Sequence, residues 1–131
     1  MKTLHRLDEL VALLERTDEP LYVRYSEGPE ADARATSVDQ ESGLELPGLS
    51  TNPLRPEPWW TRPVEDWLAR QLCQYAHLGD GGRRAWVLRG RIAGWGPDRE
   101  PLIAEPEPIA FLDEALIDEA DRIYSERFDR G

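Results

Sequence analysis

The chain has 131 residues, a net charge of −10 and one cysteine, Cys73. With 40% hydrophobic and 32% charged residues, it has the composition of a single globular domain covering residues 1–131. The acidic surface argues against nucleic acid and anionic membranes as partners, and suits a basic partner or plain solubility. One cysteine and two histidines exclude an internal disulfide and argue against a structural zinc site, so we expect no metal.

The first ten residues, MKTLHRLDEL, lack the apolar run of a signal peptide. No stretch approaches the 18 apolar residues that a membrane-spanning helix needs. We therefore expect a cytoplasmic protein.

The first half of the chain contains one clear helix and one clear strand. Residues 7–16 place apolar side chains at helical spacing, with acids early and an arginine late, which predicts an amphipathic helix. Residues 21–26 alternate and are rich in β-branched and aromatic side chains, which predicts a strand. The polar residues 27–43 predict a loop with a short strand near 36–38. Three prolines predict that residues 52–60 are extended and stiff.

The second half predicts two helices around a hairpin. A helix is predicted to begin at Pro63, because proline is tolerated in the first turn of a helix. Trp67 belongs to the apolar face of this helix, which is predicted to face the core. A strand over 86–92 and one or two short strands within 101–112 precede an amphipathic helix over 113–128. This order predicts an α+β domain with a small mixed or antiparallel sheet packed with about three helices.

Three polar residues on or after the first half's strands are candidate ligand contacts. Arg24 lies in the middle of a predicted strand, where its guanidinium could bind a phosphate or carboxylate; alternatively it lies on the solvated face. Ser50 and Thr51 could bind a sugar or an anion, or could instead satisfy backbone groups of a turn. In both cases the structural interpretation is favoured.

Two carboxylates in the second half are candidate acid and base. Glu105 and Glu107 are two residues apart, so in an extended chain both point to one side. The favoured alternative is that they solvate a sheet edge, which Pro106 and Pro108 protect from aggregation.

A candidate binding surface combines arginines and tryptophans. Arg89 and Arg91 belong to the only basic cluster, which could stack on a base or a sugar, or could balance the acidic C-terminal helix. Trp59 and Trp60 are adjacent, and in an extended segment they point to opposite sides. We expect one indole to pack under the loop and the other to be exposed as a pre-organised contact; the alternative is that both are buried.

The segments TLHRLDELVALLER, LYVRYSEGPEAD, LELPGLSTNPLRPEPWW and WVLRGRIAGWGPDREPLIAEPEPIAFLDEA resemble a family of small uncharacterised actinobacterial proteins. That resemblance covers nearly the whole chain and implies no activity.

A fainter resemblance is to ADP-ribosyltransferases, which have an early arginine, a Ser-Thr-Ser-like strand and a late E-x-E pair. It implies that Arg24, Ser50 and Thr51 bind NAD and that Glu105 and Glu107 are catalytic.

These patterns support a cytoplasmic binding module for a small ligand or a protein, without catalysis or cofactor. The alternative is an NAD-dependent ADP-ribosyltransferase. An acidic immunity or antitoxin-like protein is a third possibility, which rests on size and charge alone.

Overall fold

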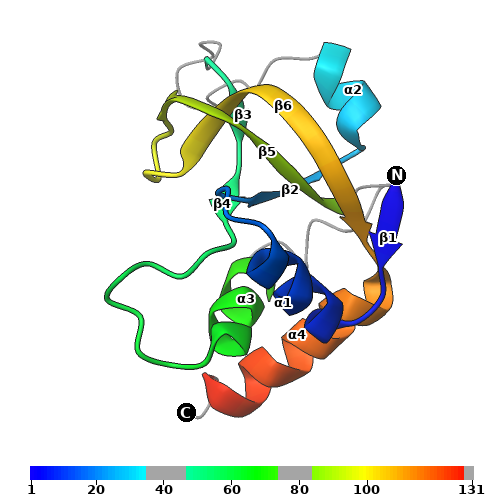
Figure 1. The fold of residues 1–131 in the computed structure, drawn as a ribbon, viewed down its shortest axis with the longest axis vertical. Helices are drawn as coiled ribbons and strands as arrows, with labels where there is room; N and C mark the ends of the chain where they lie inside the picture. The colour runs from blue at the N-terminus through cyan, green and yellow to red at the C-terminus, as the bar shows by residue number, and fades with distance from the viewer. Residues whose placement is uncertain (35–46, 74–83, 129–131) are drawn as a thin grey trace.

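The computed structural model describes residues 1–34, 47–73 and 84–128 (Figure 1). Within these ranges, four helices accompany one mixed sheet with the order β1-β6-β5-β2-β4, and β3 also pairs with β6. β1 runs parallel to β6, and the other pairings are antiparallel. The elements are β1 (Lys2–Leu4), α1 (Leu7–Arg16), β2 (Tyr22–Ser26), α2 (Pro29–Arg34), β3 (Leu49–Ser50), β4 (Asn52–Pro53), α3 (Val64–Cys73), β5 (Arg84–Trp95), β6 (Pro101–Leu112) and α4 (Glu114–Arg127).

The fold is therefore α+β, as the element order predicts. α1, α3 and α4 gather together, and α2 lies apart from them beyond the β5–β6 hairpin (Figure 1). In the described part of the chain, no helix combines the length and the apolar character required to cross a membrane.

The sheet has an apolar cluster on each face. The larger cluster includes Trp67 and Leu72 of α3, Leu116 of α4 and Val87 of β5. The prediction that α3 turns Trp67 toward the core is confirmed, since Trp67 lies in this cluster and is 3% exposed. The smaller cluster lies on the other face and consists of Tyr22, Leu49, Trp86, Leu88 and Ile103.

Two local predictions were wrong. The loop predicted over residues 27–43 contains α2, whose Pro29 at the first helical position and early acids are helix-start signals. The strand expected near 36–38 lies outside the described residues. The stretch predicted to be extended over 52–60 ends in a turn, because the Trp60 N–H donates to the Glu57 carbonyl over 2.9 Å.

The β5–β6 hairpin is longer than predicted and contains a bulge. β6 is a single strand of 12 residues rather than the one or two short strands predicted. Arg89 pairs with Glu107 whereas Arg91 pairs with Ala104, so β6 has one more residue than β5 between these pairs. Glu105, within the extra length, adopts a φ of 54°. A bulge bends a strand and increases its twist, and here it re-directs the far half of the hairpin.

Candidate functional site

Arg24 is tied into the protein by its guanidinium. Its Nε donates to Asp32 Oδ2 over 2.8 Å, and its Nη1 donates to the Ser50 carbonyl over 2.9 Å. The side chains of Arg24 and Asp32 are only 18% and 9% exposed. The ion pair links α2 to β2, and the second bond links β3 to the same strand.

Ser26 extends this connection into the smaller apolar cluster. Its hydroxyl donates to Asp32 Oδ2 over 2.6 Å and accepts from Trp86 Nε1 over 3.0 Å. The Gly28 N–H also donates to this hydroxyl. We call Arg24, Ser26, Asp32 and Trp86 the α2 anchor. Each of these side chains has a partner inside the protein, so the anchor explains how α2 is held on the sheet.

The other two candidate cofactor contacts also have internal partners. The Ser50 hydroxyl donates to Glu100 Oε2 over 3.2 Å. Thr51 is buried, and its hydroxyl donates to the Pro101 carbonyl over 3.0 Å. The structure thus brings Arg24 and Ser50 together, and Thr51 follows beside the start of β6.

Glu107 lies opposite Arg89 on the hairpin. Arg89 donates to both Glu107 oxygens, over 2.7 Å and 2.8 Å, and to Glu19 Oε2 over 2.8 Å. These hydrogen bonds raise the pKa of Arg89, and the bonds from Arg89 lower the pKa of Glu107. Glu107 is therefore ionised at neutral pH and is engaged by a cation.

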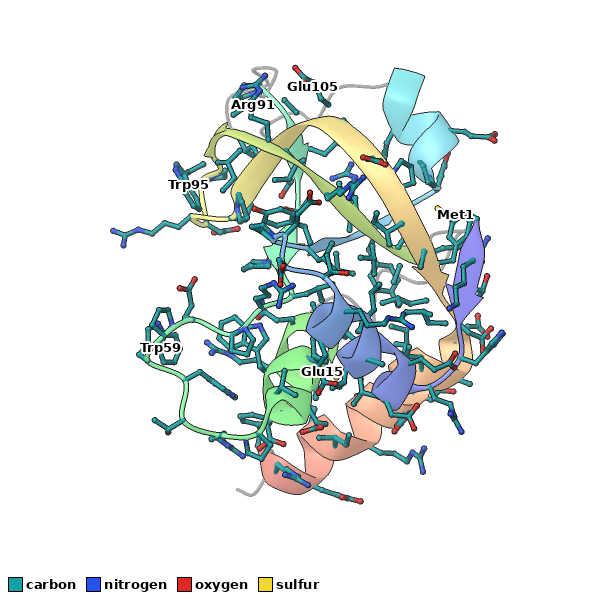
Figure 2. The ribbon with its side chains drawn as sticks, in the orientation of Figure 1. Met1, Glu15, Trp59, Arg91, Trp95 and Glu105 are labelled. Atoms are coloured by element: carbon teal, nitrogen blue, oxygen red, sulfur yellow. The ribbon has the colours of Figure 1, made fainter. Side chains whose placement is uncertain are left out.

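Glu105 and Arg91 form a looser, exposed pair. Arg91 Nη2 lies 3.5 Å from Glu105 Oε1, and both side chains are more than half exposed. Figure 2 shows the two residues near each other at the end of the molecule away from α4. Of the two candidate arginines, Arg91 is thus the more accessible.

The side chains of Arg24 and Glu107 lie on opposite faces of the sheet. Arg24 pairs with Trp86, and paired residues share a face. Trp86 and Leu88 belong to the smaller cluster while Val87 belongs to the larger one, so the side chains alternate along β5. Arg89 comes next and, with its partner Glu107, lies on the side of the larger cluster.

Trp59 and Trp60 differ in exposure, which confirms the expectation that one indole packs under the loop and the other is exposed. Trp59 is 63% exposed, whereas Trp60 is half-buried and packs against the larger cluster. They do not point to opposite sides, because the turn brings both indoles onto Trp67. The ring centroids lie 6.0 Å apart for Trp59–Trp67 and 5.1 Å for Trp60–Trp67, both edge to face.

A cleft of about 510 Å³ opens between the hairpin tip, the start of β2 and the loop after β4. This volume is in the range of small-molecule sites. We call it the tip cleft. Its lining residues are Pro20, Leu21, Tyr22, Asn52, Pro53, Arg55, Glu57, Gln71, Ile92, Trp95, Asp98, Arg99, Glu100 and Pro101.

Exposed apolar side chains form one wall of the tip cleft. Trp95 is 64% exposed and Ile92 is 42% exposed, and both lie on the far half of β5. Figure 2 shows Trp95 and Trp59 projecting from the same side of the molecule, Trp95 from the hairpin and Trp59 from the loop before α3. An exposed indole beside a concave surface is typical of a binding site.

Two arginines in the tip cleft have N–H donors without an acceptor among the described residues. Arg55 Nε donates to the Glu19 carbonyl over 3.1 Å, but its Nη2 is buried and has no partner among the described residues. Arg99 is exposed, and the described residues contain no ion-pair partner for it. The cleft therefore offers N–H donors that no residue in the described part of the chain accepts from.

The acids of the tip cleft are either engaged or exposed. Glu100 accepts from the Ser50 hydroxyl and from the Asp98 N–H. Glu57 and Asp98 are exposed. These carboxylates give the cleft a negative rim around the two arginines.

Sequence reasoning missed the tip cleft. Trp95 stands between glycines in GWGPDRE, which reads as a connection rather than as a wall of a site. Arg99 closes the turn, since its N–H donates to the Gly96 carbonyl over 3.0 Å, and its φ is 61°. Glycine or asparagine is usual at this turn position, but the positive φ of Arg99 is seen only in the structure.

The comparisons with known proteins identify a family and no activity. Residues 1–131 match a family of unknown function (DUF6098), and the chain belongs to that family. No curated protein matches the chain. No solved structure matches it either.

Proposed function

We propose that this member of a family of unknown function is a cytoplasmic, non-catalytic binding module that holds a small ligand, or the end of a peptide, in the tip cleft. One observation carries the proposal: Trp95 and Ile92 are exposed on the wall of a cleft that also contains two arginines without an ion-pair partner among the described residues. An apolar wall with a few polar groups is the usual composition of a ligand site.

The rigidity of the hairpin supports this proposal. The tip is closed by two backbone hydrogen bonds, Gly96 N–H to the Glu100 carbonyl and Arg99 N–H to the Gly96 carbonyl. Glu100 is further fixed by Ser50 of β3. A contact surface that is ordered before binding costs less entropy when the ligand arrives.

A fragment screen by ligand-observed NMR tests the proposal. The screen uses anionic, neutral and cationic aromatic fragments of similar size against the wild type and Trp95→Ala. We expect saturable binding of at least one class that Trp95→Ala weakens about tenfold or more, because the variant removes the indole wall. Trp59→Ala serves as the matched control, since Trp59 is equally exposed but does not line the cleft. Fragments that bind both tryptophan variants like the wild type, or no fragment binding at all, would refute the proposal.

An NAD-dependent ADP-ribosyltransferase is the second candidate. It is favoured by the direct bond from Arg24 to the Ser50 carbonyl, which brings two of the implied NAD contacts together. Its catalytic Glu107 would have to act from the opposite face of the sheet, where Arg89 engages it. The proposal predicts nicotinamide release from NAD that Glu107→Gln abolishes. No release above a protein-free blank would exclude it.

A further inference from the structure

We propose that the tip cleft recognises a carboxylate attached to an apolar or aromatic body. Arg99 and Arg55 hold the carboxylate, and Trp95 and Ile92 contact the apolar body. This inference rests on the binding function proposed above and names the chemical class of the ligand.

The arginines carry the first step. A guanidinium group presents parallel N–H donors that match the two oxygens of a carboxylate. Arg99 is exposed and without an ion-pair partner in the described part of the chain. Arg55 adds a buried Nη2 that has no acceptor among the described residues, and a buried donor without an acceptor is unfavourable. A carboxylate in the cleft supplies that acceptor once the Arg55 guanidinium turns toward it.

The protein's overall charge makes these unpaired arginines informative. In a chain with a net charge of −10, carboxylate partners are abundant, and Arg24, Arg62 and Arg89 each have one. Within the described ranges Arg99 has no ion-pair partner, although it adopts a φ of 61°, which is unfavourable for any residue with a Cβ. Local strain at a non-glycine residue is typical of functional positions. We therefore assign the Arg99 side chain to ligand binding.

The rim selects against more highly charged anions. Glu57 and Asp98 are exposed cleft residues, and Glu100 lies beside them. The three acids outnumber the two arginines by one charge, so a phosphate dianion is disfavoured about twice as strongly as a monocarboxylate. The apolar wall of Trp95 and Ile92 also needs a ligand with an apolar part, which inorganic phosphate lacks.

A matched pair of probes tests the inference without any mutation. 3-Phenylpropionate and its uncharged amide have the same aromatic body and nearly the same shape. In titrations followed by the indole N–H resonance of Trp95, we expect the acid to bind at least tenfold more tightly than the amide, since hydrogen bonds to charged groups contribute about 1.5–3 kcal/mol. Equal affinity for acid and amide, or tighter binding of inorganic phosphate, would overturn the inference.

Arg99 variants localise the effect. Arg99→Gly removes the guanidinium while suiting the positive φ, so the turn is retained. We expect it to reduce the affinity for the acid about tenfold and to leave the affinity for the amide unchanged, whereas Arg99→Lys keeps part of the preference. Arg122→Met is the control, because it removes an exposed arginine of α4 that lies outside the cleft. An Arg99→Gly variant that still prefers the acid as strongly as the wild type does would show that Arg99 is not the anchor.

The source of the carboxylate is separated by a second pair of probes. A hexapeptide ending in phenylalanine is compared with its C-terminally amidated form. A free-acid peptide that binds more tightly than 3-phenylpropionate indicates a peptide terminus, and the reverse order indicates a small carboxylic acid; both outcomes support the inference. If neutral or cationic fragments occupy the cleft and acids do not, the inference fails while the binding function stands. If nothing binds there, both fail.

Discussion

Arg89 and Glu107 face each other across β5 and β6 and share two hydrogen bonds of 2.7 Å and 2.8 Å. The side chain proposed from sequence as a catalytic acid is therefore also part of an exposed ion pair on the hairpin. Its lowered pKa is the opposite of what a general acid at neutral pH requires.

The lowered pKa of Glu107 predicts a pH-dependent contribution to stability. A carboxyl group whose pKa is lower in the folded state stabilises the fold at any pH above its unfolded-state pKa, here 4.5. This stabilisation is lost as the pH falls through the folded-state pKa. We expect Glu107→Gln to melt slightly below the wild type at pH 7, by no more than about 2 °C because the pair is exposed. The difference between the two melting temperatures should shrink as the pH falls below 4.5. A difference that does not shrink with falling pH would show that the loss is not electrostatic.

Asp32 should be important for the stability of the α2 region. It accepts from both Arg24 and Ser26, and its side chain is 9% exposed. Asp32→Ala leaves the Arg24 charge without its partner, so we expect a loss of about 2 kcal/mol in urea unfolding. Asp118→Ala on the exposed face of α4 is the control and should change stability by less than about 0.5 kcal/mol. Equal effects of the two substitutions would contradict the role of the anchor.

The elements with strong periodicity were predictable from the sequence. α1, α3 and α4 have apolar residues at helical spacing, and β2 alternates, so burial against one core fixes each of them. α2 was missed because six residues of mostly small and polar character show no periodic apolar face. Its position depends on the Arg24–Asp32 ion pair, a contact between side chains that local patterns do not reveal.

The tip cleft could not be predicted, since its residues come from four separate parts of the chain. Arg55 lies in the loop after β4, and Gln71 lies on α3. Trp95 and Arg99 lie at the hairpin tip. They are brought together by the pairing of β2 with β4 and β5, by the pairing of β5 with β6, and by the hydrogen bond from Gln71 to the Pro53 carbonyl. Such a juxtaposition depends on tertiary register rather than on sequence spacing.

Gly48 and Gly94 should respond differently to the same substitution. A Cβ on Gly48 would lie 2.7 Å from backbone atoms of Ile103, whereas a Cβ on Gly94 would lie 3.3 Å from the Pro47 ring. Backbone in a paired strand cannot give way easily, so we expect Gly48→Ala to cost about 1–3 kcal/mol. Gly94→Ala should cost clearly less in the same urea titration. Equal costs would mean that Gly48, just before β3, does not approach Ile103 of β6 as closely as described.

Cys73 should be an unreactive thiol. Burial, and to a lesser extent Asp121, raises its pKa from 9.0 to about 12. Its thiolate fraction at pH 8 is thus about a thousandfold lower than that of an ordinary cysteine, and the thiolate is the reactive form. We expect iodoacetamide to alkylate the native protein far more slowly than the urea-unfolded protein.

Because the pKa of Cys73 is raised on folding, the stability of the protein should fall from about pH 9 upward, and it should fall less in Cys73→Ala.

The three tryptophans before and within α3 should separate core from surface. Trp67 is 3% exposed and its Nε1 donates to the Pro53 carbonyl, so Trp67→Ala should cost about 3–5 kcal/mol. Trp59 is 63% exposed and contacts Trp67 only edge to face, so Trp59→Ala should cost no more than about 1 kcal/mol. Trp60→Ala should fall between them, since Trp60 is half-buried and its Nε1 donates to the Pro63 carbonyl. Urea unfolding ranks the stabilities of the three variants. The change in acrylamide quenching in each variant shows how accessible the removed indole was. If Trp59→Ala destabilises as strongly as Trp67→Ala, the exposed indole belongs to the core.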